Sequence, residues 1–419
     1  MLLGIGSFLA PFVGDCRGHV RISIVMKTFL GSLLMSVLAC ALTASAADAK
    51  KILLLAGKQS HGPGDHEFRA GCLLLKKCLD AVPGLHTEVH ANGWPEDMAA
   101  FDGVDAVLIY ADGGGGHPAV QGDRIQFINS LVKKGVSVGC AHYGVEVLKG
   151  EAGNAMFDWI GGHYEHEYSV NPMWSPNFTT FPEHPVTRGV KPFALIDEWY
   201  FNMRWRPDGK GITPILVATP SDDVRDGPYV YPPGPYPHIV AQSGRSETMM
   251  WVYDRPDGGR GFGFTGGHKH VNWANDNFRK VVLNGILWLA GMEVPQDGVV
   301  STISDETIVQ NQDRKKGAAE IPNLTGNWTF EVKTEQGTGN PTFHLTHAGQ
   351  NILGRYKGLF GEQDVFGSVK GNRVTLNLDV TADGDPMTVT YTGELGDNGT
   401  LTGKVRFGDL GAGTWSATR

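Results

Sequence analysis

Short apolar runs alternate with amphipathic stretches between residues 51 and 292, and this alternation constrains the possible folds more than any other feature of the chain. Continuous apolar runs of about five residues are typical of strands buried on both faces of a parallel sheet. Helical spacing of apolar residues follows these runs, as in strand–helix–strand units. The sequence therefore predicts an α/β fold with a doubly wound, mainly parallel sheet, and strands at residues 51–56, 106–110, 136–140 and 261–265.

Three helices are expected beside these strands. The first carries apolar residues at helical spacing over residues 68–79, and Asp65 is its expected N-cap. The second is expected to begin near Pro118, because proline suits the first helical turn. The third is expected over residues 276–289.

An aromatic and proline-rich segment interrupts this rhythm over residues 163–240. Long Gly/Pro turns and many Trp, Tyr and His residues are unusual for the core of a parallel sheet. We expect this segment to form a lid or rim over the site.

The pattern changes again toward the C-terminus. Residues 294–323 are polar and lack a sustained apolar period, so a linker is expected between an α/β domain (47–293) and the last segment. Residues 324–419 alternate with period two between turns, which predicts a small antiparallel β domain, either a barrel or a sandwich. Similar Gly-x-Trp motifs ending at Trp328 and Trp415 suggest that its first and last strands meet.

The first 46 residues are expected to be a leader. Residues 26–46 combine a basic start, an apolar run and a small-residue step, which is typical of a secretory signal. A periplasmic or secreted protein is therefore expected, with lipid attachment through Cys40 as the alternative. The formal net charge of −8 disfavours nucleic acid as a partner, and the apolar run of the leader is too short for membrane insertion.

Histidines and carboxylates follow the predicted strands. Twelve of the fifteen histidines fall between residues 61 and 270. Ligands of open parallel sheets bind beyond the carboxyl ends of the strands, so side chains that follow different strands are expected at one edge. A single loop histidine is more often a surface or hydrogen-bonded residue than a functional one. The prediction of a site therefore depends on the occurrence of histidines after all four strands. The residues after the four strands are His61, His66 and Glu67; Asp112 and His117; His142; and His268 and His270.

Two kinds of chemistry fit such a set. The first is a divalent metal site for zinc, iron or manganese, since imidazole and carboxylate ligands suit these ions; its expected ligands are His66, His163, His268 and His270. The second is metal-free acid–base catalysis on a sugar-like substrate, with His142 as base and Glu67 or Glu165 as proton carrier. A polar network that only holds the lid remains the structural alternative. The expected substrate contacts are His61, Asp112, Gly113, Gly114, Gly115, Gly116, His117 and Trp273.

Four motifs resemble the trehalose-utilisation (ThuA-like) family over roughly residues 51–293. They are Ser60-His-Gly-Pro-Gly-Asp-His-Glu67, Ala111-Asp-Gly-Gly-Gly-Gly-His-Pro118, Phe157-Asp-Trp-Ile-Gly-Gly-His-Tyr-Glu165 and Gly258-Gly-Arg-Gly-Phe-Gly-Phe-Thr-Gly-Gly-His268. The resemblance implies a class I glutamine amidotransferase-like, flavodoxin-like fold and a role in the use of trehalose and related disaccharides through keto-sugar intermediates. The C-terminal segment loosely resembles lipocalin-like accessory domains.

The amidotransferase relatives place a nucleophilic cysteine at a strand–helix elbow. The matching position here is His142, and Cys140 lies two residues earlier, inside the predicted strand. We therefore expect an exported carbohydrate-active enzyme, a hydrolase or lyase acting on a glycoside or keto-disaccharide. The alternatives are a non-catalytic sugar-binding protein and a Cys140-dependent amidase. The sequence leaves the sugar, the bond, the metal and the oligomeric state open.

Overall fold

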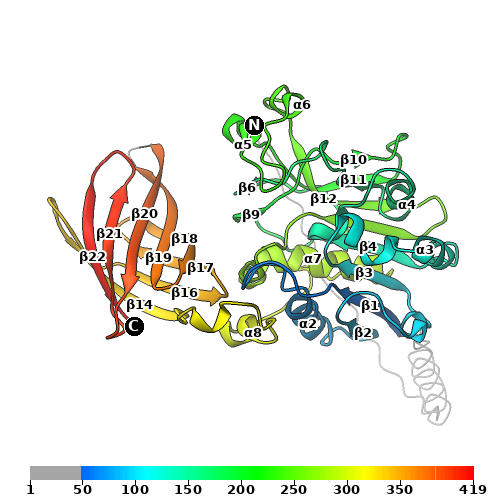
Figure 1. Cartoon of the computed structure of the whole chain (residues 1–419), viewed down its shortest axis with the longest axis horizontal. Helices are drawn as coiled ribbons and strands as arrows, with labels where there is room; N and C mark the ends of the chain where they lie inside the picture. Colours follow the sequence, from blue (N-terminus) through cyan, green and yellow to red (C-terminus); the bar gives the residue numbers. More distant parts are fainter. Residues whose placement is uncertain (1–48, 383) are drawn as a thin grey trace, which may run out of the picture. The chain divides into compact units, whose positions relative to one another are not determined.

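The computed structural model describes residues 49–382 and 384–419 (Figure 1). The expected secretory signal and Cys40 lie outside these residues. Within the described part of the chain, no helix combines the length and apolar composition needed to cross a bilayer.

A seven-stranded mixed sheet organises the first domain, with the strand order β11-β12-β13-β4-β3-β1-β2. The run from β2 to β13 is parallel, and β12 is antiparallel to both of its neighbours. The strands are β1 (Lys50–Ala56), β2 (Leu85–His90), β3 (Ala106–Tyr110), β4 (Ser137–Ala141), β11 (Ile212–Ala218), β12 (Glu247–Asp254) and β13 (Arg260–Phe264). The expected mainly parallel α/β sheet is confirmed.

Helices cover both faces of this sheet (Figure 1). Successive side chains of a strand point to opposite faces, so an apolar run builds two cores at once. In β1, Ile52 and Leu54 pack in the same core as α2 (Phe68–Leu79) and α7 (Asp276–Leu289). Leu53 and Leu55 pack in the opposite core, with α3 (Arg124–Val132) and α4 (Glu151–Trp159).

Two expected helix starts are wrong. Helix α2 has Glu67 at its N-cap position without a capping side chain, and the Asp65 carboxylate accepts a hydrogen bond from Asn351 instead. Pro118 begins only a short 3₁₀ turn, η3 (Pro118–Val120). The chain then passes through Gly122 in the left-handed region, with φ of 59°, before α3 starts.

The segment expected as a lid consists of very short elements that are held together by tertiary contacts. Strands β6 and β9, β7 and β8, and β5 and β10 form two-residue antiparallel pairs. Phe178, Trp199 and Phe201 are buried in the core that α7 covers. The elements are β5 (Gly162–His163), β6 (Met173–Trp174), β7 (Asn177–Phe178), η5 (Pro185–Thr187), β8 (Phe193–Ala194), β9 (Asp197–Glu198), β10 (Arg204–Trp205), α5 (Asp222–Asp226) and α6 (Pro237–Val240).

The C-terminal domain is a closed antiparallel barrel (Figure 1). Strand β14 pairs with β22, so the first and last strands meet as the sequence predicts. Trp328, Phe330 and Val332 alternate into the barrel core. The strands are β14 (Gly326–Thr334), β15 (Gly337–Gly339), β16 (Thr342–Ala348), β17 (Asn351–Gly358), β18 (Gly361–Lys370), β19 (Arg373–Ala382), β20 (Asp385–Leu395), β21 (Leu401–Phe407) and β22 (Ala412–Thr418).

The segment expected as a linker packs against the α/β domain. It contains α8 (Asp305–Val309) and η7 (Ala318–Glu320), and Val294 and Ile308 are buried in the main core. The domain boundaries themselves remain predictions. The other 3₁₀ turns are η1 (Met98–Phe101), η2 (Gly114–Gly116), η4 (His142–Val145) and η6 (His270–Ala274).

Candidate metal centre

Three histidines that follow parallel strands converge at one edge of the sheet. His66 follows β1, His142 follows β4 and His268 follows β13, and all three are buried. His66 and His142 have φ of 49° and 51°, which costs a residue with a side chain about 1–3 kcal/mol. The expected histidine-rich cluster at the carboxyl edge of the sheet is confirmed for these three residues.

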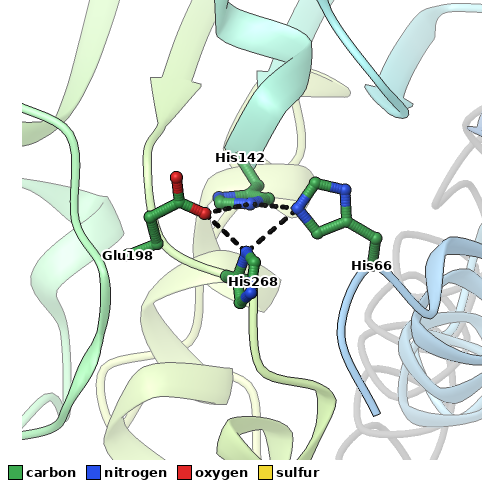
Figure 2. A group of neighbouring side chains, drawn as sticks. All are labelled: His66, His142, Glu198 and His268. Atoms are coloured by element: carbon green, nitrogen blue, oxygen red, sulfur yellow. Dashed lines mark hydrogen bonds and ion pairs between the residues drawn. The ribbon is translucent and has the colours of Figure 1, made fainter. Parts of the chain in front are cut away.

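A fourth residue, Glu198 of β9, completes the cluster (Figure 2). Its Oε2 atom lies 2.5 Å from Nδ1 of His268 and 3.7 Å from Nε2 of His142. Nε2 of His66 lies 2.9 Å from Nε2 of His142 and 3.0 Å from Nδ1 of His268. One ligand atom from each residue lies within 4.8 Å of the other three.

The outer nitrogens of the His66 and His142 rings each contact an oxygen atom. Nδ1 of His66 lies 2.9 Å from the Asp112 carboxylate, and Nδ1 of His142 lies 3.0 Å from the Thr265 carbonyl oxygen. The Thr265 carbonyl can only accept, so His142 donates from Nδ1, and in the neutral ring Nε2 keeps a lone pair. Oxygens behind the rings fix the ring orientation and the tautomer, as they do for histidines that bind metals.

Hydrogen bonds also fix the position of Glu198 and of the loop that carries His268. The Oε1 atom of Glu198 accepts a hydrogen bond of 2.7 Å from Nδ2 of Asn171. The adjacent Asp197 carboxylate accepts hydrogen bonds from the backbone N–H groups of Gly267 and Lys269, on either side of His268. Oε2 of Glu198 is thereby directed at the histidines.

The protonation of the cluster follows from burial and charge. Burial lowers the pKa of His142 to about 3, despite the opposing effect of Glu198. Burial, together with His142 and His268, lowers the pKa of His66 well below its ordinary value. Burial also disfavours the charged form of His268, but Asp65 and Glu198 outweigh it and raise the pKa of His268 to about 10. The rings of His66 and His142 are therefore neutral. The positive charge is favoured on His268, whose Nδ1 atom contacts Glu198.

This donor set fits a divalent metal ion. Three imidazole nitrogens and one carboxylate oxygen are ligands of zinc, iron and manganese. The inner nitrogens of His66 and His142 are neutral acceptors in contact, and a cation between them would relieve their repulsion. The Tyr200 hydroxyl lies 3.5 Å from Nε2 of His142, the same nitrogen that His66 contacts.

Several polar residues lie beside His66 and are partly open to solvent. The exposed ring of His61 lies 3.6 Å from the ring of His66, and the Tyr143 ring lies 5.9 Å from it. Asp112 is half-buried and accepts hydrogen bonds from His66 and from the Ser60 hydroxyl. These groups form a polar, partly exposed surface beside the cluster, which we call the approach to the cluster.

Glu146 is the most perturbed carboxyl near this approach. Burial, reinforced by the charge of Glu198, raises the pKa of Glu146 to about 8. A Cβ atom on Gly114 would lie 3.8 Å from Oε1 of Glu146 and 3.9 Å from the Tyr143 hydroxyl. A Cβ atom on Gly113 would lie only 2.2 Å from the Tyr143 carbonyl oxygen, so glycine is needed for this close approach. The sequence interpretation did not consider Glu146.

Four residues expected at the site lie elsewhere. His117 caps η3 through Ala119 and contacts the Gly144 carbonyl oxygen. His163 contacts the Tyr164 carbonyl oxygen and the ring of Phe157. His270 directs Nε2 at the Ile308 carbonyl oxygen. Trp273 is fully buried against Phe278 and offers no open stacking face.

The two expected proton carriers are both engaged in ion pairs. Glu67 is fully buried, 3.1 Å from Nζ of Lys315, and also accepts hydrogen bonds from the backbone N–H groups of Gly64 and Asp313. Glu165 pairs with Arg204 at 2.9 Å. Neither residue belongs to the four-residue cluster.

Cys140 is a free, fully buried thiol inside β4. Burial raises its pKa far above the ordinary value, so the reactive thiolate is disfavoured. The position after the strand belongs to His142, whose strained backbone places the imidazole in the cluster.

A family model described as trehalose utilisation (ThuA) matches residues 77–289, half of the chain. This chain belongs to the ThuA family. The matched range includes His142, Glu198 and His268, whereas His66 and the barrel lie outside it. A ThuA-like protein from Bacteroides uniformis has a solved structure that is 13% identical, with a TM-score of 0.41, over 58% of this chain and 92% of that chain. The search of curated proteins finds no match.

Proposed function

We propose that this ThuA-family chain is a metal-dependent enzyme that cleaves the glycosidic bond of a keto-disaccharide or a related glycoside. The main observation in support of this proposal is that four ligand atoms, from four separate segments, lie within 4.8 Å of one another. Oxygen acceptors behind the rings of His66 and His142 support this interpretation, since they leave the inner nitrogens as acceptors.

The proposed ligands are His66, His142, Glu198 and His268, and zinc, iron or manganese would suit them. A bound divalent ion would act as a Lewis acid toward a substrate carbonyl or hydroxyl oxygen. The chain's part is to hold the ligands at their positions, and the substrate would approach beside His66 and Asp112.

Glu146 is the proposed proton carrier. With a pKa near 8, its carboxyl group holds a proton at neutral pH and can donate it. In a hydrolysis, the bond between the anomeric carbon and the bridging oxygen breaks and the Glu146 proton passes to that oxygen. The oxygen of water bonds to the anomeric carbon, and one proton of that water returns to Glu146. In an elimination, the Glu146 carboxylate, which is the form present above its pKa, would accept the proton from the carbon between the keto group and the anomeric carbon. A double bond would form between that carbon and the anomeric carbon as the bond to the bridging oxygen breaks, and Glu146 would pass the same proton to the leaving oxygen.

The remaining polar groups on the approach are proposed to bind the sugar. His61, Asp112 and the Tyr143 hydroxyl offer donors and acceptors for hydroxyl groups. Within the Gly113–Gly116 run, Gly115 and Gly116 are exposed to solvent, whereas Gly113 is buried against Tyr143. The family's description as trehalose utilisation supports a disaccharide as the substrate class.

A non-catalytic sugar-binding protein is the rival proposal. A protein that only binds sugar has no need for a buried group of four metal-type ligands or for a raised carboxyl pKa. The Cys140-dependent amidase loses support because the thiol is fully buried and its ionisation is disfavoured.

Turnover decides between these proposals. The full chain would be incubated with 3-keto-disaccharides and with unmodified disaccharides, with and without a chelator, while monosaccharide release is followed. The proposal expects release from the keto-sugar that stops on chelation and returns with added metal. Sugar binding without product would favour the rival.

Export to the periplasm or beyond also remains a proposal. Detection of the protein outside the cytoplasm, without its first 46 residues, would support it. Retention of the leader in the cytoplasm would contradict it.

A further inference from the structure

Asn351, at the start of strand β17 of the barrel, joins two loops of the metal centre. Its Oδ1 atom accepts a hydrogen bond of 2.7 Å from Nζ of Lys269, which is adjacent to His268. Its Nδ2 atom donates a hydrogen bond of 2.8 Å to Oδ1 of Asp65, which is adjacent to His66. Asn351 is buried, so both ends of the amide are used where water has little access.

The carboxylate that Asn351 holds stands behind a proposed metal ligand. Oδ1 of Asp65 lies 3.6 Å from Nε2 of His268, a charge contact on the side of the ring opposite Glu198. A carboxylate behind a ligating histidine orients the ring and strengthens it as a ligand. The contacts thus run from Asn351 through Asp65 to His268.

The backbone around Asn351 packs tightly on the loop that carries His66. The N–H group of Gln350 donates to the Pro63 carbonyl oxygen at 2.9 Å. A Cβ atom on Gly64 would lie 2.3 Å from the Ala348 carbonyl oxygen, and one on Gly349 would lie 2.2 Å from the Gly64 nitrogen. Both glycines also have positive φ, so this turn of the barrel and the loop meet at a distance that only glycine allows.

We infer that the barrel is a positioning element of the metal centre, with Asn351 fixing Asp65 behind His268. This inference rests on the proposed metal-dependent function. Asn351 is a positioning residue, because its side chain bonds Lys269 and Asp65 and none of the four proposed metal ligands. The C-terminal domain thereby has a role in the chemistry of the first domain.

The test measures the Zn²⁺ affinity of the full chain by competition with a chromogenic chelator. Asn351→Ala removes both hydrogen bonds, and Asn351→Asp sets a carboxylate against Asp65. We expect either change to weaken Zn²⁺ binding about tenfold or more, as is usual for mutations of residues that orient metal ligands from behind. Asn377→Ala is the matched control, because this barrel asparagine bonds only Thr390 among the described residues. The control should bind Zn²⁺ like the wild type.

A double variant separates positioning from a simple loss of folding. Asp65→Asn combined with Asn351→Asp exchanges donor and acceptor, which restores the hydrogen bond but removes the carboxylate from its place behind His268. We expect the melting temperature of the metal-free chain to recover while Zn²⁺ affinity stays low. Recovery of both would show a purely structural contact and overturn the inference.

The outcomes distinguish this inference from the proposed function. If the wild type binds Zn²⁺ and both single variants bind it equally well, the inference fails and the proposed metal site stands. If the wild type binds no Zn²⁺, iron or manganese, the proposed function fails, and the inference fails with it.

Discussion

Nε2 of His66 lies 2.9 Å from Nε2 of His142, and each of the two atoms belongs to a buried ring whose other nitrogen contacts an oxygen. Burial keeps both rings neutral at ordinary pH because it lowers the pKa of each. Two acceptor nitrogens at this distance repel each other unless a positive charge lies near both. The imidazolium form of His268 supplies that charge, and a metal ion would supply more of it.

Glu198 should contribute more to metal affinity than Glu165, which the sequence analysis expected as one of two proton carriers. Glu198→Gln removes the only carboxylate of the four-residue cluster, so metal affinity should fall more than about tenfold. Glu165→Gln loses only the ion pair with Arg204 and serves as the control. Zn²⁺ competition measures both. Equal effects of the two changes would contradict the assignment of Glu198 as a ligand.

The raised pKa of Glu146 predicts a particular dependence of stability on pH. The folded chain holds the Glu146 proton up to about pH 8, whereas the unfolded chain releases it near the ordinary glutamate pKa of 4.5. This contribution to stability is fully present below pH 4.5 and is lost as the pH rises toward 8. Urea unfolding of metal-free wild type and Glu146→Gln should therefore diverge across this range.

The control for that measurement is Glu151→Gln, since Glu151 is exposed at the start of α4. Its stability should follow the wild type at each pH. A Glu146→Gln variant whose stability also follows the wild type would show that Glu146 ionises normally.

Replacement of the buried thiol should leave catalysis intact. Cys140→Ala removes one sulfur atom from the interior of β4 and should cost about 1 kcal/mol of unfolding free energy. Turnover of keto-disaccharide should stay within about twofold of the wild type, because Cys140 is not part of the cluster. Loss of turnover in a variant that still melts cooperatively would revive the thiol mechanism.

The buried ion pair of Glu67 should be a stability element. Lys315→Met leaves the Glu67 carboxylate without its cation and should cost about 3 kcal/mol or more of unfolding free energy. Adding Glu67→Gln should recover part of this loss, because the uncompensated charge disappears. Urea unfolding measures both variants. A Glu67→Gln single variant that folds normally but loses all turnover would restore Glu67 as a catalytic candidate.

Much of the α/β fold could be predicted because its signals are local. The buried strands 51–56 and 106–110 and the helices over 68–79 and 276–289 have continuous apolar runs or helical spacing, and the structure places them within a residue. The convergence of His66, His142 and His268 followed from a general rule about the carboxyl edge of parallel strands. No contact between them is visible in the sequence itself.

Glu198 could not be found in this way because it follows no strand of the main sheet. It lies in the two-residue strand β9, whose position depends on pairing with β6 in an irregular segment. The adjacent carboxylates Asp197 and Glu198, within an aromatic stretch, were the available signal. They lacked any local period that would place them at the site.

His268 and His270 show how a local backbone change defeats sequence spacing. On an extended chain the two rings would share one face, and the sequence analysis expected both as metal ligands. His270 instead begins the 3₁₀ turn η6, which turns its ring to the Ile308 carbonyl oxygen. Asp65 similarly resembled a helix cap, yet its carboxylate lies behind His268.

Equilibrium titration of the full, chelator-treated chain with Zn²⁺ measures whether the four-residue cluster binds a metal ion. We predict one tightly bound ion per chain, at least tenfold weaker binding by the His142→Ala variant, and unchanged binding by the His86→Ala variant, because His86 is exposed. The same titration with iron and manganese covers the other ions that suit these ligands. If the folded wild type binds none of the three ions stoichiometrically, the cluster is not a metal centre.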